Sequence, residues 1–210
     1  DIEQQNNYPW DGDLKFIVSP KKGNLPFNLK VRIPGWASNQ AIPSDLYSFK
    51  TNTDVKPEII VNGKPMEFTV DKGYAVISRI WKKTDVVEVK LPMEVRRVIA
   101  NKILKEDGGK VALQRGPLMY CAEWVDNNGL ASNIVLPASA SFTAEFKPGL
   151  LNGITVLKSE ADKINLSGDN ISNSRQPFVA IPYYAWANRG KGEMTVWFTE
   201  KVRAVEIIAE

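Results

Sequence analysis

The 210-residue sequence contains no histidine and a single cysteine, Cys121. Without an imidazole the chain cannot form a Ser-His-Asp or Cys-His catalytic site, a His-ligated metal site or a histidine pH switch. With one thiol it cannot form an intrachain disulfide or a zinc site of four cysteines. The composition therefore excludes much common enzyme chemistry, and a function has to be sought in local patterns.

Long hydrophobic runs and a strong net charge are also missing. Charge or proline interrupts each apolar stretch within about ten residues, well short of the ~20 residues that a membrane helix needs. The chain has 27 Lys and Arg against 24 Asp and Glu, a net charge of +3, which gives no strong reason to expect a nucleic acid or an anionic membrane as partner. The length suits one large or two small domains. Because the sequence begins at Asp1 with no Met and no leader-like segment, we expect a mature or excised piece.

Alternation of apolar and polar residues dominates the first half. In 27–33 the apolar residues occupy odd positions, so one face of a strand meets a core and the other meets water. Residues 13–19 repeat this pattern. Asn62-Gly63 separates 58–61 from 66–70 and is typical of a type I′ hairpin turn. With 74–80 and 85–91, five or six strands are expected before residue 92.

Residues 93–104 allow two interpretations. Val95, Val98, Ile99 and Ile103 have helical spacing, but Pro92 and the many β-branched residues suit the edge of a sheet, which we favour. A turn at 106–109 follows, and then a second block of short strands. These are expected at 111–113, 118–124, 134–136, 142–146, 154–157, 178–181, 194–198 and 204–208.

The predicted fold class is all-β, with two antiparallel β-sandwich domains and little helix. We expect residues 1–104 to form the first β-sandwich and residues 105–193 the second. The final strands near 194–210 could return to the first sandwich.

Three pairs of acidic residues are near enough in sequence to be considered as the two carboxylates of a glycoside hydrolase. They are Asp11/Asp13, Glu106/Asp107 and Glu123/Asp126. The first two have turn composition, in which short acidic side chains bond to their own backbone. Cys121 could be a nucleophile, but a free cysteine in an apolar strand is more often a small buried hydrophobe. We therefore predict no catalytic residue and no metal ligand in this chain.

Aromatic residues are the remaining candidates, and they could fill a core, stack against sugar rings or form an interface. The densest group follows Pro182, where residues 183–192 read as a loop with aromatics and an arginine, a plausible contact surface. The predicted substrate-binding or interface residues are Trp10, Tyr183, Tyr184, Trp186, Asn188 and Arg189.

Several ordered strings carry a family resemblance. They are YPWDG (8–12), RIPGWA (32–37), VNG (61–63), GY (73–74), RIW (79–81), LPM (91–93), ALQRGPLMY (112–120) and PYYAWANRG (182–190). In this order they resemble the C-terminal part of glycoside hydrolase family 127, the β-L-arabinofuranosidase family. The resemblance extends from about Tyr8 to Trp197.

The resemblance implies that catalysis belongs to an (α/α)6 barrel that precedes the β domains. In that family a zinc-bound cysteine is the nucleophile and a glutamate is the acid/base. Nothing here matches the zinc motif, and Cys121 does not match the nucleophile, so we expect no cofactor in this chain and zinc in the barrel.

The favoured function is thus a non-catalytic C-terminal region that supports the barrel, its missing partner, and could also form a homo-oligomer through the sandwich. Trp10, Tyr184, Trp186 and Arg189 would lie near the patch where the barrel docks. Two alternatives remain: a carbohydrate-binding module that holds a glycan through Tyr183, Tyr184 and Trp186, and a protein-interaction sandwich that uses 183–189.

Overall fold

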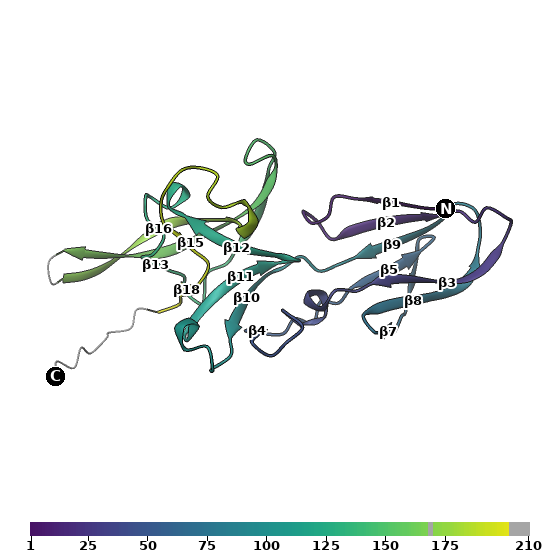
Figure 1. Ribbon diagram of the computed structural model, residues 1–210, viewed down its shortest axis with the longest axis horizontal. Helices are drawn as coiled ribbons and strands as arrows, with labels where there is room; N and C mark the ends of the chain where they lie inside the picture. Colours follow the sequence, from purple (N-terminus) through teal and green to yellow (C-terminus); the bar gives the residue numbers. More distant parts are fainter. Residues whose placement is uncertain (168–169, 202–210) are drawn as a thin grey trace. The chain divides into compact units, whose positions relative to one another are not determined.

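The computed structural model describes residues 1–167 and 170–201, which form β-strands joined by turns and short 3-10 helices (Figure 1). Contacts divide the chain into two units. The first unit comprises 1–95 together with 115–117, and the second comprises 96–114 and the described residues from 118 onward. The all-β prediction is confirmed. Within the described ranges, no helix is long and apolar enough to cross a membrane.

Two antiparallel sheets build the first unit. Its strands are β1 (Ile2–Asn6), β2 (Asp13–Val18), β3 (Leu25–Arg32), β4 (Tyr47–Phe49), β5 (Glu58–Val61), β6 (Lys64–Met66), β7 (Val70–Asp71), β8 (Tyr74–Trp81) and β9 (Asp85–Lys90), with a 3-10 helix η1 (Gly35–Ser38). One sheet has the order β1-β2-β9-β5-β6 and the other β3-β8-β7, and the short strand β4 belongs to neither. The predicted hairpin at Asn62-Gly63 joins β5 to β6, and both residues have positive φ, 50° and 74°.

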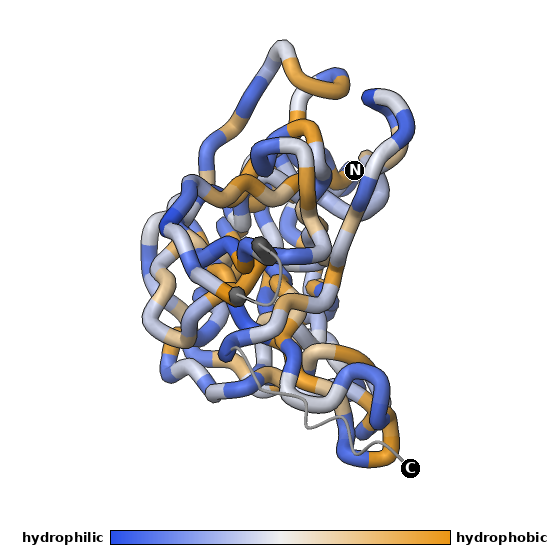
Figure 2. The backbone as a smooth tube through the Cα atoms, turned by 90° about the vertical axis from the view of Figure 1, so that its left-hand side faces the viewer, coloured by the Kyte–Doolittle hydropathy of each residue, from blue (hydrophilic) through white to orange (hydrophobic). Residues whose placement is uncertain are grey.

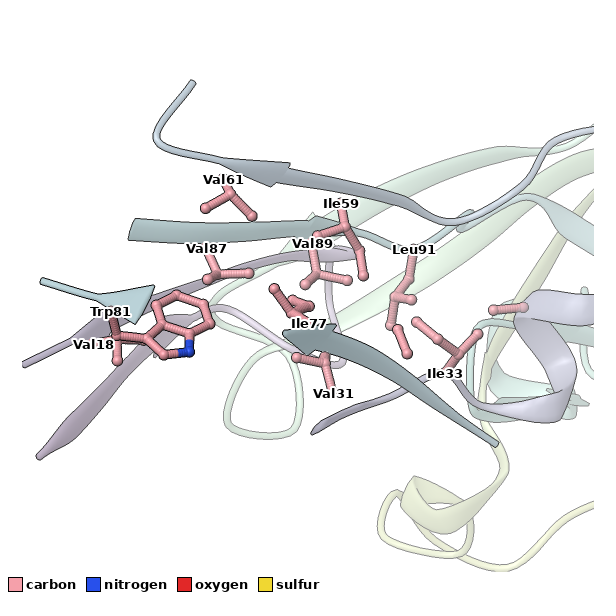
Figure 3. Close-up of a cluster of buried hydrophobic side chains, with 12 residues drawn as sticks. Val18, Val31, Ile33, Ile59, Val61, Ile77, Trp81, Val87, Val89 and Leu91 are labelled. Carbon is pink, nitrogen blue, oxygen red and sulfur yellow. The ribbon is translucent and has the colours of Figure 1, made fainter. Parts of the chain in front are cut away.

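The core of the first unit receives side chains from both sheets. From Phe27 to Val31 the odd positions of β3 are more buried than the even ones, as expected, and Val31 is buried while its neighbour Arg32 is exposed, although Leu25 at the start of the strand is exposed. Figure 3 shows Val87 and Val89 of β9 facing Val31 and Ile77 of the other sheet. Trp81 is fully buried, stacks on Phe27 at 5.5 Å between ring centroids and donates its Nε1–H to the Phe27 carbonyl at 2.9 Å.

The second unit contains the strands from β10 onward. They are β10 (Val95–Ala100), β11 (Lys110–Arg115), β12 (Leu118–Glu123), β13 (Ile134–Val135), β14 (Thr143–Lys147), β15 (Ile154–Ser167), β16 (Asn170–Pro182), β17 (Met194–Thr195) and β18 (Phe198–Thr199), with 3-10 helices η2 (Lys105–Asp107), η3 (Trp124–Asp126) and η4 (Tyr183–Ala185). Their order is β17-β12-β16-β15-β13-β18-β11-β10, with β14 beside β15. Because β12 also pairs with β11, the strands β12, β16, β15, β13, β18 and β11 form a closed ring of paired strands.

The ambiguous segment 93–104 contains a strand, β10, so the helical alternative is wrong. Its Val and Ile residues lose side-chain freedom in a helix but pack well on a pleated sheet. From Arg96 onward this strand belongs to the second unit, whereas the sequence-based boundary lies after residue 104.

The longest pair of strands, β15 and β16, was predicted only at its ends. Sequence patterns indicated strands at 154–157 and 178–181, but the two strands pair continuously from Leu157↔Ala180 to Ser167↔Asn170 (Figure 1). The expected final strands are found in part. β17 pairs with β12, and β18 with β11 and β13, all in the second unit, whereas the strand expected at 204–208 lies outside the described residues.

Hydropathy changes sign over short distances along the backbone. Figure 2 shows short hydrophobic and hydrophilic stretches following one another along the tube. This pattern is typical of strands with one buried and one solvent-exposed face. Some strands depart from it. In β11 the four residues from Val111 to Gln114 are all buried, so both faces of this strand are covered.

Candidate functional site

An exposed aromatic cluster marks the strongest candidate site. Residues 183–190, here called the aromatic loop, begin with η4 directly after β16 ends at Pro182. Tyr183 is 44%, Tyr184 61% and Trp186 39% exposed. The Tyr183 and Trp186 rings are nearly parallel, with an angle of 14° and centroids 6.3 Å apart. Three large aromatic side chains therefore meet solvent within four consecutive positions.

Hydrogen bonds below the exposed rings fix the backbone of the aromatic loop. Ala185 is buried, and the Trp186 N–H donates to the Tyr183 carbonyl at 3.3 Å. The Asn188 amide Nδ2 donates to the carbonyls of Ala185 and Trp186, both at 3.1 Å. Ala187 has a φ of 63°, a left-handed conformation unusual for this residue, and donates its N–H to Glu123 Oε1 at 2.9 Å. The loop thus has a defined conformation below its exposed rings.

Arg189 fixes the loop to two carboxylates. Its Nε donates to Glu123 Oε2 at 3.1 Å, and its Nη1 and Nη2 donate to the two Asp126 oxygens at 2.9 and 2.6 Å. Nη2 also contacts Glu123 Oε2. Burial alone would lower the pKa of Arg189, but the hydrogen bonds to Asp126 and Glu123 outweigh it and raise the pKa above its ordinary value. We call Glu123, Asp126 and Arg189 the arginine clamp.

The carboxylates of the clamp are positioned by β12 and η3. Glu123 ends β12 and is buried, and Asp126 closes the single turn of η3. Buried Asn127 fixes that turn, because its Nδ2 donates to the carbonyls of Glu123 and Val179 at 2.8 and 2.9 Å. A charge as buried as Glu123 requires a paired and hydrogen-bonded partner, which Arg189 supplies.

A cavity of about 420 Å³ lies beside Trp186. Its lining residues are Glu123, Trp186, Ala187, Gly190, Lys191, Gly192 and Met194. Gly192 packs so tightly that a Cβ there would come within 1.9 Å of Trp124 Cδ1. The aromatic loop therefore presents a ridge of rings next to a hollow.

A larger cavity of about 900 Å³ lies in the first unit. Most of its lining is apolar, including Ile33, Ile59 and Phe68, and its charged lining residues are Lys56, Glu58 and Glu67. These groups do not form a recognisable catalytic arrangement.

The structure brings five of the six predicted residues together. Tyr183, Tyr184, Trp186, Asn188 and Arg189 all belong to the aromatic loop. Trp10 belongs to the first unit, where it is half-buried and its carbonyl accepts a hydrogen bond from Arg115 Nη1 at 2.9 Å.

Two of the groups considered for catalysis, Cys121 and the Asp11/Asp13 pair, are respectively buried and bonded within a local turn. Cys121 is fully buried, and burial, followed by the charge of Glu123, raises the pKa of its thiol to about 12. Asp11 Oδ1 accepts the Asp13 N–H at 3.1 Å, which is a local turn contact. Across 1–167 and 170–201, no three Cys, Asp or Glu residues form a group that could hold a metal ion.

Sequence patterns do not reveal the link between Arg189 and its carboxylates. They indicate Glu123 and Asp126 only as a possible catalytic pair, and Arg189 only as a contact residue. The clamp joins residues more than sixty positions apart, and no local pattern in the sequence connects them.

Two sequence profiles of one glycoside hydrolase family match the chain. A profile described as the beta-L-arabinofuranosidase GH127 middle domain matches residues 1–93, and one described as the glycoside hydrolase family 127 C-terminal domain matches residues 95–199. Two successive domains of one enzyme family thus account for nearly all of this all-β chain. The chain belongs to glycoside hydrolase family 127.

Individual relatives agree with this assignment. The non-reducing end beta-L-arabinofuranosidase of Bifidobacterium longum subsp. longum is 31% identical over 211 residues, covering 93% of this chain and 30% of that protein. A solved GH127 beta-arabinofuranosidase has a TM-score of 0.90 and 40% identity, covering 95% of this chain and 31% of its own. The GH127 beta-L-arabinofuranosidase Ara127N of Geobacillus stearothermophilus T6 has a TM-score of 0.81 and 39% identity, covering 95% and 30%. The chain spans about a third of the length of these relatives.

Proposed function

We propose that this chain is the non-catalytic C-terminal β-sandwich region of a β-L-arabinofuranosidase-like glycoside hydrolase, in which it supports a catalytic (α/α)6 barrel. The observation that carries the proposal is that the chain matches the middle and C-terminal domains of family 127 while spanning about a third of its relatives. The side chains considered for catalysis support it. Glu123 and Asp126 bind Arg189, and Cys121 is buried with a raised pKa.

The zinc-thiolate chemistry of the resembled family does not fit the residues of this chain. A zinc site needs several thiolate, imidazole or carboxylate ligands. The sequence has no histidine and one cysteine, and that thiol is buried and resists ionisation. We therefore assign the nucleophile and any zinc to the barrel, and no cofactor to this chain.

A hydrolysis assay tests the proposal. The purified chain should not release the aglycone from aryl β-L-arabinofuranosides, with or without added zinc, whereas the longer polypeptide that contains it should. Turnover by the chain alone would contradict the proposal. Repeating the assay with Cys121→Ser would then show whether the thiol is responsible.

A second candidate function, a carbohydrate-binding module, is favoured by the exposure of Tyr183, Tyr184 and Trp186, because aromatic faces can stack on sugar rings. Titration of the chain with L-arabinose oligosaccharides or plant glycans tests it. A module should bind and lose affinity on Trp186→Ala but not on Tyr74→Ala, a change at a similarly exposed aromatic of the first unit. A homo-oligomer formed through the sandwich would appear in sedimentation as a mass above that of one chain.

A further inference from the structure

We infer that the aromatic loop is a preformed docking platform for the remainder of the longer polypeptide, and that the arginine clamp sets its conformation. The inference rests on the proposed function and deepens it, because it names the docking surface and the residues that position it. It departs from the sequence-based expectation by leaving out Trp10, which belongs to the first unit.

The aromatic loop exposes its rings beside a hollow. Tyr183, Tyr184 and Trp186 are followed by the hollow lined by Gly190, Gly192 and Met194. Neighbouring exposed aromatics mark interaction sites more often than they mark ordinary surface, and interface centres are enriched in Tyr and Trp. A ridge next to a hollow is a shape into which a protruding side chain of a partner can fit.

Hydrogen bonds order the aromatic loop before any partner binds. The clamp, the Ala187 N–H bond to Glu123 and the two Asn188 bonds hold the loop without help from the exposed rings. A surface that is already ordered loses less conformational entropy on association than one that must fold at that moment. Arg189 has its charge compensated by Glu123 and Asp126, so docking would not bury an unpaired guanidinium.

The arrangement of the rings favours protein over sugar as the occupant. Tyr183 and Trp186 stack against each other with an angle of 14°. One face of each ring is therefore turned toward the other ring, and fewer faces remain for a sugar. The relatives that this chain matches are about three times longer than the chain, which supplies a large body of polypeptide to cover such a surface. The occupant is therefore the rest of the same polypeptide.

Hydroxyl-radical footprinting tests the platform. The chain alone and the longer polypeptide are oxidised in parallel, and modification of each aromatic residue is measured by mass spectrometry. We expect Tyr183, Tyr184 and Trp186 to react in the chain alone and to become as unreactive in the longer polypeptide as Tyr120, which is fully buried. Tyr74, 41% exposed in the first unit, is the matched control and should react equally in both.

Two variants distinguish the positioning role of Arg189 from the packing role of the exposed rings. In the longer polypeptide, Arg189→Lys keeps the charge but loses the planar fork that grips two carboxylates, so Trp186 should regain reactivity. Tyr184→Ala, at an exposed position, should have the same effect without changing the melting temperature of the chain alone. If Arg189→Lys prevents folding, Tyr184→Ala and its counterpart Tyr74→Ala still decide the question.

Three outcomes would overturn the inference. The first is equal reactivity of the three rings in both polypeptides. The second is an equal loss at Tyr74, and the third is protection of the chain alone by added arabino-oligosaccharide. None of these depends on the hydrolysis assay, so the platform can fail while the proposed function stands, and turnover by the chain alone would refute the proposed function by itself.

Discussion

Asn62 and Asp85 are joined by a hydrogen bond of 2.9 Å from Asn62 Nδ2 to Asp85 Oδ1. Asn62 lies in the turn between β5 and β6, and Asp85 begins β9. The Asn62 side-chain oxygen also accepts the Val86 N–H at 2.8 Å, and Asp85 Oδ2 accepts the Lys82 N–H at 2.9 Å. One pair of side chains thus connects two turns at one end of the first sandwich.

Replacing Asn62 should destabilise the first unit. Asn62→Ala removes two hydrogen bonds and leaves the buried Asp85 short of a donor, a loss of about 1–3 kcal/mol in the free energy of unfolding. Alanine also tolerates the φ of 50° poorly. Chemical denaturation measures the effect, and Asn24→Ala, at an exposed loop position, is the control. Equal stability of the two variants would refute the role of Asn62.

Asp85 should make stability depend on pH in the acid range. Burial alone would raise the pKa of Asp85, but the Lys82 N–H, the Asn62 amide and the charge of Arg79 outweigh burial and lower it. The stabilisation is therefore present above the ordinary aspartate pKa of about 3.9 and is lost as the pH falls through the lower folded-state value.

The corresponding experiment compares the wild type with Asp85→Asn by thermal unfolding between about pH 2 and about pH 6. The variant should be less stable near neutral pH, and the difference in melting temperature should shrink as the solution is acidified. A difference that stays constant over this range would show that the charge of Asp85 does not contribute.

Gly12 should not accept a side chain. A Cβ at this position would lie 2.0 Å from the Leu91 carbonyl oxygen, a backbone atom that cannot rotate away. Gly12→Ala should therefore lower the free energy of unfolding by about 1–3 kcal/mol or more. Gly149→Ala is the matched control, because no atom lies within 4 Å of its added Cβ. A melting temperature of Gly12→Ala equal to that of Gly149→Ala would contradict the clash.

The single thiol should be inert in the folded chain. Burial raises the pKa of Cys121 to about 12, so almost no reactive thiolate is present near neutral pH. A thiol reagent should label the native chain slowly and the chain in guanidinium rapidly, with one label per chain because Cys121 is the only cysteine. Rapid labelling of the native chain would reopen the question of a reactive cysteine.

Strands with one solvent-exposed and one buried face were predictable from the alternation of polar and apolar residues. The alternation in 27–33 predicted β3 because its apolar side chains meet the opposite sheet, and Asn62-Gly63 predicted a hairpin because both residues tolerate positive φ. The middle of the β15–β16 hairpin was not predictable in this way. Residues such as Arg175 and Ser174 are exposed and polar, and the strands there are held by pairing with each other.

The exposed aromatic residues of the candidate site were predictable from the sequence. Tyr183, Tyr184 and Trp186 stand out because three aromatic residues gather within four positions of a loop that follows proline. The buried contacts of Glu123 and Asp126 were not predictable, because their partner Arg189 comes close to them only when β16 pairs with β12 in the folded chain. A tertiary contact of this range leaves no periodic signal in a single sequence.

Residues 115–117, which end β11 and form the turn to β12, belong to the first unit, although the rest of β11 and all of β12 belong to the second. Gly116, with a φ of 56°, packs so closely that a Cβ would lie 2.7 Å from Met93 Sδ, and Arg115 donates to the Trp10 carbonyl. A chain being synthesised from its amino terminus reaches residue 95 without these contacts. The first unit can therefore be completed only after the ribosome has passed Pro117, and a gene cut at the domain boundary would encode a sandwich that lacks one of its own parts.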